Sequence, residues 1–145
     1  MEDISIYRQK TLKTIEEAED LLYRTYALTK DNKLFLTIIL KLFSSLEYLL
    51  NTVLNDKIGS KDSFLAKVSI LRQEKSKLSE DDFEFFTFIK NLMEEHKLSS
   101  MEFARKEKFV ITDENYNLHT LTYENLEEYL NTTKKIIAQL LMEKY

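Results

Sequence analysis

Apolar residues recur every three or four positions along most of the chain, which is the spacing of one face of an α-helix. The pattern predicts helices over residues 3–29, 33–56, 60–78 and 80–97, and a last helix that begins at Thr122. The expected core stripe of the first helix is Ile4, Thr11, Ile15, Ala18, Leu22 and Tyr26. That of the last helix is Leu126, Leu130, Thr133, Ile137, Leu140 and Leu141.

Residues 34–54 form the most apolar stretch, with 14 apolar or aromatic residues among 21. A membrane-spanning helix has a similar length, but this stretch contains Lys41 and Glu47. Each charge near a membrane centre costs about 2.5–3.5 kcal/mol on insertion scales. We therefore expect the central helix of a bundle and no membrane contact. The residues expected deepest in the core are Leu46, Leu50, Phe86 and Leu130.

Polar residues with turn and cap preferences separate these helices. Asp31 and Asn32 form a turn, because their side chains bond the local backbone. Ser79 and Asp82 resemble a capping box, with Asp in place of the usual Glu or Gln, and predict the start of the helix over 80–97. Thr122 is the expected cap of the last helix.

The helical period fails over residues 98–121. Phe103, Phe109 and Ile111 lie at odd positions with polar neighbours, which is the period of a strand. Residues 113–117 have the composition of a turn, and residues 118–121 are expected to pair back as a short hairpin. A connection of this length is often functional in a compact domain.

The chain of 145 residues has one glycine and no proline. Sandwiches and barrels need many turn residues that tolerate positive φ, and a nucleotide-binding phosphate loop needs several glycines. Both are therefore excluded. The sequence predicts one all-α domain over residues 1–145, a four- to five-helix antiparallel bundle with a short irregular or hairpin segment before the last helix.

The absence of cysteine excludes disulfides and thiolate chemistry. The chain begins with Met1, Glu2 and Asp3, where a secretory signal carries positive charge, and no apolar signal region follows. Both observations favour a cytoplasmic protein.

Charge varies along the chain around a formal net charge of −4. Residues 56–78 carry +3, residues 79–96 carry −5 and residues 97–110 carry +2. An acidic balance argues against strong nonspecific binding of nucleic acid. Faces that pair across neighbouring helices are the ordinary explanation.

The candidate chemical site is a polar cluster of His96, Glu102, Arg105, Lys106 and His119. Its arginine and lysine suit a phosphate, and a histidine moves protons near neutral pH. The competing interpretation is a solvated turn and an amphipathic edge strand, with Arg105 in a structural role. We expect no metal site, because no Glu-x-x-His pair occurs, and no cofactor. No catalytic residue is assigned.

The layout resembles the HEPN (higher eukaryotes and prokaryotes nucleotide-binding) family. The resemblance rests on two long antiparallel helices, the segment LFSSLEYLL at residues 42–50, a polar junction and a final helix. It implies a helical bundle that forms a dimer. Catalytic members are metal-independent ribonucleases with closely spaced Arg and His. Here Arg105 and His119 are much farther apart in the sequence, so the resemblance extends to the scaffold and not to that motif.

Three functions remain open from the sequence. The preferred one is a noncatalytic helical interaction module, a homodimer that binds another macromolecule, either protein or RNA. The alternative is an HEPN-like ribonuclease or RNA-associated protein with a rebuilt active site. The third is a pocket for a small apolar ligand among the phenylalanines of residues 83–88.

Overall fold

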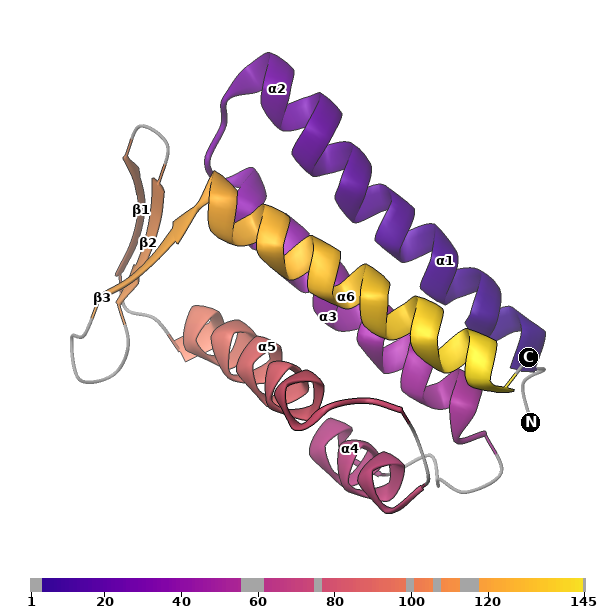
Figure 1. Cartoon of the computed structure of the whole chain (residues 1–145). Helices are drawn as coiled ribbons and strands as arrows, with labels where there is room; N and C mark the ends of the chain where they lie inside the picture. The colour runs from indigo at the N-terminus through magenta and orange to yellow at the C-terminus, as the bar shows by residue number, and fades with distance from the viewer. Residues whose placement is uncertain are drawn as a thin grey trace.

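The computed structural model describes the backbone of residues 4–55, 62–74, 77–98, 101–105, 108–112 and 118–144. It confirms an all-α bundle (Figure 1). The first predicted helix is continuous through three parts: α1 (Ile4–Asp20), the π-helix η1 (Leu21–Thr25) and α2 (Tyr26–Thr29). The other helices are α3 (Leu34–Val53), α4 (Phe64–Gln73), α5 (Glu80–Leu98) and α6 (Tyr123–Lys144).

Helix α3 is the central element of the bundle. Helices α1, α4, α5 and α6 all pack against it, and Figure 1 shows α1 and α6 lying along its length. By length and composition α3 also satisfies the criteria for a membrane span, as core helices of bundles often do. The predicted core residues Leu46, Leu50, Phe86 and Leu130 are all fully buried, which confirms the expected helix registers.

The predicted caps are confirmed by hydrogen bonds. The Ser79 amide donates to Asp82 Oδ2 at 3.1 Å, and the Asp82 amide donates to Ser79 Oγ at 3.2 Å. Thr122 Oγ1 accepts from the Asn125 amide at 3.2 Å, and Asn125 Oδ1 accepts from the Thr122 amide at the same distance. These reciprocal bonds satisfy amides that a helix start leaves free.

The prediction of a helix over residues 60–78 was too long. Ser63 is extended and its hydroxyl accepts from the Ala66 amide, so α4 begins only at Phe64. Glu74 is extended as well and ends the helix after Gln73. Leu78, which lies beyond the end of α4, is nevertheless buried in the hydrophobic core.

The segment before α6 forms a small antiparallel sheet in the order β1-β2-β3. The hairpin prediction is confirmed by the pairing of β2 with β3, and β1 adds a third strand. The expected turn at 113–117 lies outside the described residues. The strands are β1 (Met101–Arg105), β2 (Lys108–Thr112) and β3 (Leu118–Thr122).

The π-helix was not predicted. Its wider turn is marked by the Tyr26 amide, which donates to the Leu21 carbonyl five residues earlier. Thr14, Ala18, Leu22 and Tyr26 are buried at steps of four residues. In an unbroken α-helix each such step rotates the side chain by about 40° away from the previous one. The wider turn at Leu21–Thr25 counteracts this drift between Leu22 and Tyr26 and keeps both side chains toward the core.

Candidate functional site

The backbone positions of the predicted polar cluster are only partly brought together. His96 lies near the end of α5, Glu102 and Arg105 lie on β1, and His119 lies on β3. The strand register aligns Glu102 with His119 through Ile111, whereas Arg105 aligns with Lys108 and Thr122. Lys106 and the side chains of the other four residues lie outside the described part of the chain, so a joint polar site stays a prediction.

Three of the four phenylalanines proposed for an apolar ligand lie in the core. Phe83, Phe85 and Phe86 are buried in the main hydrophobic cluster, and Phe88 is 41% exposed. Among the side chains that the structure describes, no group of three or more His, Asp or Glu is placed to hold a metal ion.

A groove of about 320 Å³ lies on the surface between α1 and α6. Both helices pack against α3. Apolar residues dominate the groove: Ile15, Ile137 and Leu141 are buried, while Leu12 is 40% exposed. Two cations, Arg8 and Lys134, and the small Ala138 complete the lining. The exposed Leu12 and the groove together form an apolar area on the surface between the two helices.

Polar contacts hold α1 and its continuation against α6 beyond this groove. Lys134 forms an ion pair with Glu19, and the Tyr23 hydroxyl donates to Glu127 Oε2 at 3.0 Å. Burial raises the pKa of Tyr23 to about 12, and the carboxylate of Glu127 contributes in the same direction. The Tyr23 ring also meets that of Tyr123 edge to face, with ring centroids 6.5 Å apart. The relative position of α1 and α6 is therefore fixed by several contacts.

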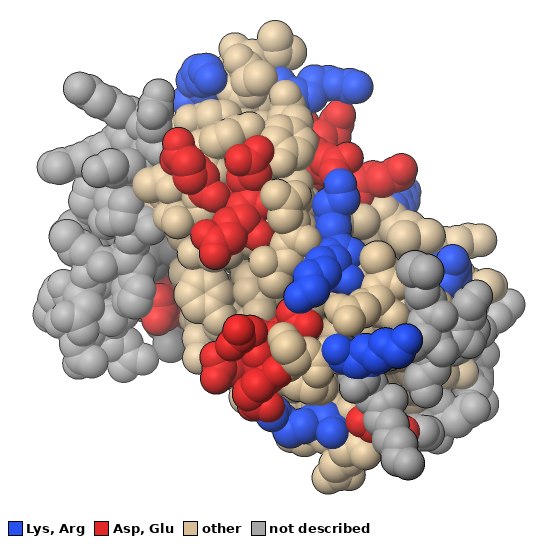
Figure 2. Space-filling view, viewed as in Figure 1, with Lys and Arg blue, Asp and Glu red and all other residues tan. Residues whose placement is uncertain are grey.

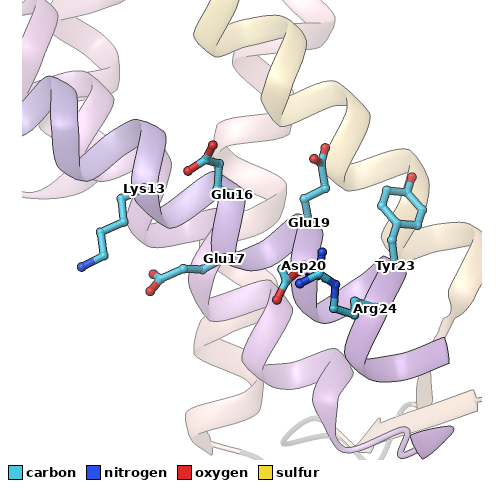
Figure 3. A pocket seen from close by; sticks show the side chains of 7 residues that line it. All are labelled: Lys13, Glu16, Glu17, Glu19, Asp20, Tyr23 and Arg24. Carbon is cyan, nitrogen blue, oxygen red and sulfur yellow. Dashed lines mark ion pairs between the residues drawn. The ribbon is translucent and has the colours of Figure 1, made fainter. Parts of the chain in front are cut away.

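Four carboxylates follow one another closely on α1, beside a hollow of about 670 Å³ (Figure 3). Three of them are paired: Glu17 with Lys41 at 3.3 Å, Glu19 with Lys134, and Asp20 with Arg24 at 3.3 Å. Glu16 has no ion pair or hydrogen bond with any residue that the structure describes. The hollow is thus largely a solvated charged face, with one carboxylate available to another molecule.

Arg8 is in the same situation as Glu16. Within the described ranges its guanidinium has no carboxylate partner. Arg8, Leu12 and Glu16 follow one another at steps of four residues, each turned by about 40° from the one before, and we call them together the α1 strip. All three residues are exposed. The strip has a free positive charge at one end, an exposed leucine in the middle and a free negative charge at the other end.

Sequence reasoning missed this strip because it treated exposed charges as one solvated class. The spacing of Arg8, Leu12 and Glu16 was visible, but the same spacing occurs on many helix surfaces. Only the structure separates Glu16 from Glu17, Glu19 and Asp20, which have partners.

Comparison with known proteins adds no assignment: no family model matches the chain, and neither a curated protein nor a solved structure is significantly similar to it.

Proposed function

We propose that this chain is a noncatalytic helical interaction module that works as a homodimer, joined through the α1 strip, and that binds another macromolecule. The observation that carries the proposal is the self-complementary order of charges around Leu12. The apolar groove beside Leu12 supports it.

The pairing follows from helix geometry. A residue rises about 1.5 Å along an α-helix, so Arg8 and Glu16 lie about 6 Å to either side of Leu12. When two copies of α1 run antiparallel about a two-fold axis at Leu12, Arg8 of one copy lies level with Glu16 of the other. The same contact occurs twice, as in every isologous dimer. The two Leu12 side chains then meet at the axis, at the edge of the apolar groove that each copy contributes.

Burial of Leu12 supplies the affinity in this arrangement, and the charges supply the register. Exposed ion pairs contribute little to stability, but they select one orientation of two helices over another. A parallel arrangement would place Arg8 beside Arg8 and Glu16 beside Glu16, and it is therefore disfavoured.

Charge reversal tests this pairing. Arg8→Glu and Glu16→Arg each turn two attractive contacts into two repulsive ones, so each should weaken the dimer about 30-fold. The double variant, Arg8→Glu with Glu16→Arg, restores opposite charges and should recover most of the wild-type affinity. Sedimentation equilibrium over a series of concentrations measures the dissociation constant of each protein.

Lys13→Glu is the matched control, because it makes the same kind of charge change on α1 at an exposed position outside the strip. It should leave the dissociation constant within about three-fold of wild type. Circular dichroism confirms that each variant is folded. A wild-type mass of 17.3 kDa at every concentration, or failure of the double variant to recover, would overturn the homodimer.

The ribonuclease alternative has its own test. Wild type and Arg105→Ala are incubated with end-labelled single-stranded RNA without added metal. We expect no cleavage by either protein. Cleavage by wild type that is lost in Arg105→Ala would overturn the noncatalytic proposal and point to the cluster around Arg105.

A further inference from the structure

Three aromatic rings meet on the surface between α5 and α6. The ring centroids of Phe88 and Tyr129 are 5.1 Å apart, those of Phe85 and Tyr129 are 6.1 Å apart, and those of Phe85 and Phe88 are 6.3 Å apart. Phe85 is buried beneath the other two, Tyr129 is half-buried, and Phe88 is 41% exposed. A phenylalanine held in place by two rings and still open to solvent is a preformed aromatic contact.

Exposed carboxylates lie on the same two helices as this aromatic contact, and Glu128 is close enough to raise the pKa of Tyr129, which burial raises first. Asp81 and Glu84 on α5, and Glu124 and Glu128 on α6, are exposed and have no ion-pair partner among the described residues. Glu84 is one helical turn before Phe88, and Glu128 is adjacent to Tyr129. Figure 2 shows acidic side chains gathered over α5 and over the beginning of α6, with uncharged surface between the two groups.

Other carboxylates of α5, in contrast, do have ion-pair partners. Asp82 contacts Lys135 at 3.4 Å, Glu80 contacts Arg72, and Glu94 contacts Lys90 at 2.7 Å. Within the described ranges, these three cations pair with other acidic residues of α5, whereas Asp81 and Glu84 of the same helix have no ion-pair partner.

We infer that this aromatic–acidic face binds an arginine-bearing basic segment of a partner protein. An aromatic ring has a negative face that attracts a guanidinium group, and arginine makes such contacts more often than lysine. The four carboxylates raise the local concentration of a cationic partner and orient it. RNA is disfavoured, because its phosphates would meet an acidic surface. The inference rests on the proposed interaction module and names the class of macromolecule that it binds, through a face that the α1 strip does not use.

The probe is a short synthetic peptide rich in arginine, compared with a peptide of the same sequence in which citrulline replaces every arginine. Citrulline keeps the shape of the side chain and removes its charge. Calorimetric titration should show binding of the arginine peptide and none of the citrulline peptide. Amide shifts in a nitrogen-labelled sample should be largest around Phe88 and Tyr129.

Two variants separate the contribution of the aromatic ring to peptide affinity from that of the carboxylates. Phe88→Leu keeps an apolar side chain and removes the ring, and it should weaken binding about five-fold. Glu84→Gln with Glu128→Gln should weaken binding and reduce its dependence on salt. The matched controls are Leu65→Ala, at a 37% exposed apolar residue of α4, and Asp20→Asn, at an exposed carboxylate of α1 outside the α1 strip. Neither should change the affinity for the peptide.

An unchanged affinity in Phe88→Leu, or equal losses in the controls, would reduce binding to general charge attraction and overturn the inference. Tighter binding of single-stranded RNA than of the arginine peptide would overturn it too. The titrations are repeated on Arg8→Glu. Peptide binding that persists when this variant is monomeric separates the face from the homodimer, so either proposal can fail without the other.

Discussion

Replacement of Asp82 by alanine should destabilise the fold by about 2 kcal/mol, because this carboxylate serves the start of α5 in two ways. It accepts the Ser79 amide within the reciprocal cap. Such a cap contributes about 1 kcal/mol. It also places negative charge in the first turn of α5. There it interacts with the helix dipole for about 0.3–1 kcal/mol, or more when partly buried. Asp82 is only 3% exposed, so water replaces the lost contacts poorly.

Urea denaturation followed by circular dichroism measures the loss. For a domain of this size a loss of about 2 kcal/mol corresponds to a fall of about 4–8 °C in melting temperature. Asp82→Asn keeps an oxygen for the Ser79 amide but removes the charge, so it should lose about half as much as Asp82→Ala.

The ion pair with Lys135 is the competing explanation. The Lys135 side chain is 61% exposed. Because exposed ion pairs contribute little, Lys135→Met should cost less than about 0.5 kcal/mol. If Lys135→Met destabilised the protein as much as Asp82→Ala does, the cap would not be the source of the stability and the reasoning would be refuted.

Three further predictions concern stability. Leu50 is fully buried, whereas Leu28 is 82% exposed. Leu50→Ala should therefore cost about 2–5 kcal/mol in urea denaturation. Leu28→Ala should change the stability by less than about 0.5 kcal/mol, and equal effects of the two would contradict the core position of Leu50. Ser63→Ala should cost about 1 kcal/mol, because it removes the hydroxyl that accepts from the Ala66 amide. Ser63→Asp should keep most of the wild-type stability, because its carboxylate can accept the same bond. Equal losses in the two variants would contradict the cap. The pKa of Tyr23 is raised from its ordinary 10.0 to about 12, so folding favours its neutral phenol. The stabilisation that results is complete below pH 10. It is lost as the pH rises through 12. The stability difference between wild type and Tyr23→Phe should therefore shrink over that range, and a constant difference in alkaline denaturation would disprove the role of Tyr23.

The parts of the fold that depend on local chemistry were predictable from the sequence. Ser79 with Asp82 and Thr122 act within three residues of themselves, so their cap bonds follow from residue types and spacing. The registers of α3 and α6 follow from long apolar stripes, which have only one way to face a core. The π-helix was not predictable in this way, because the position of its wider turn is recognised from packing against other helices.

The α1 strip and the aromatic–acidic face were also hidden in the sequence. Both are defined by charged residues without a partner among the described residues: Arg8, Glu16 and Glu84. Which carboxylates have a partner depends on where Lys41, Lys134 and Lys135 lie in space. The separation of two residues along the sequence does not predict such long-range pairing.

The π-helix gives α1 an unusual tolerance to a change in chain length. A deletion within an ordinary α-helix turns everything on one side of it by about 100°, which removes a whole stripe from the core. The turn at Leu21–Thr25 instead contains one residue more than an α-helical turn holds. Deletion of the exposed Arg24 would let the helix close into regular α-helical bonding, with Leu22 and Tyr26 brought to a three-residue spacing that still places both toward the core. This turn is therefore a position at which the gene can lose a codon and the protein can keep its fold, whereas the loss of Thr14 from the same helix would displace half of the face that packs on α3.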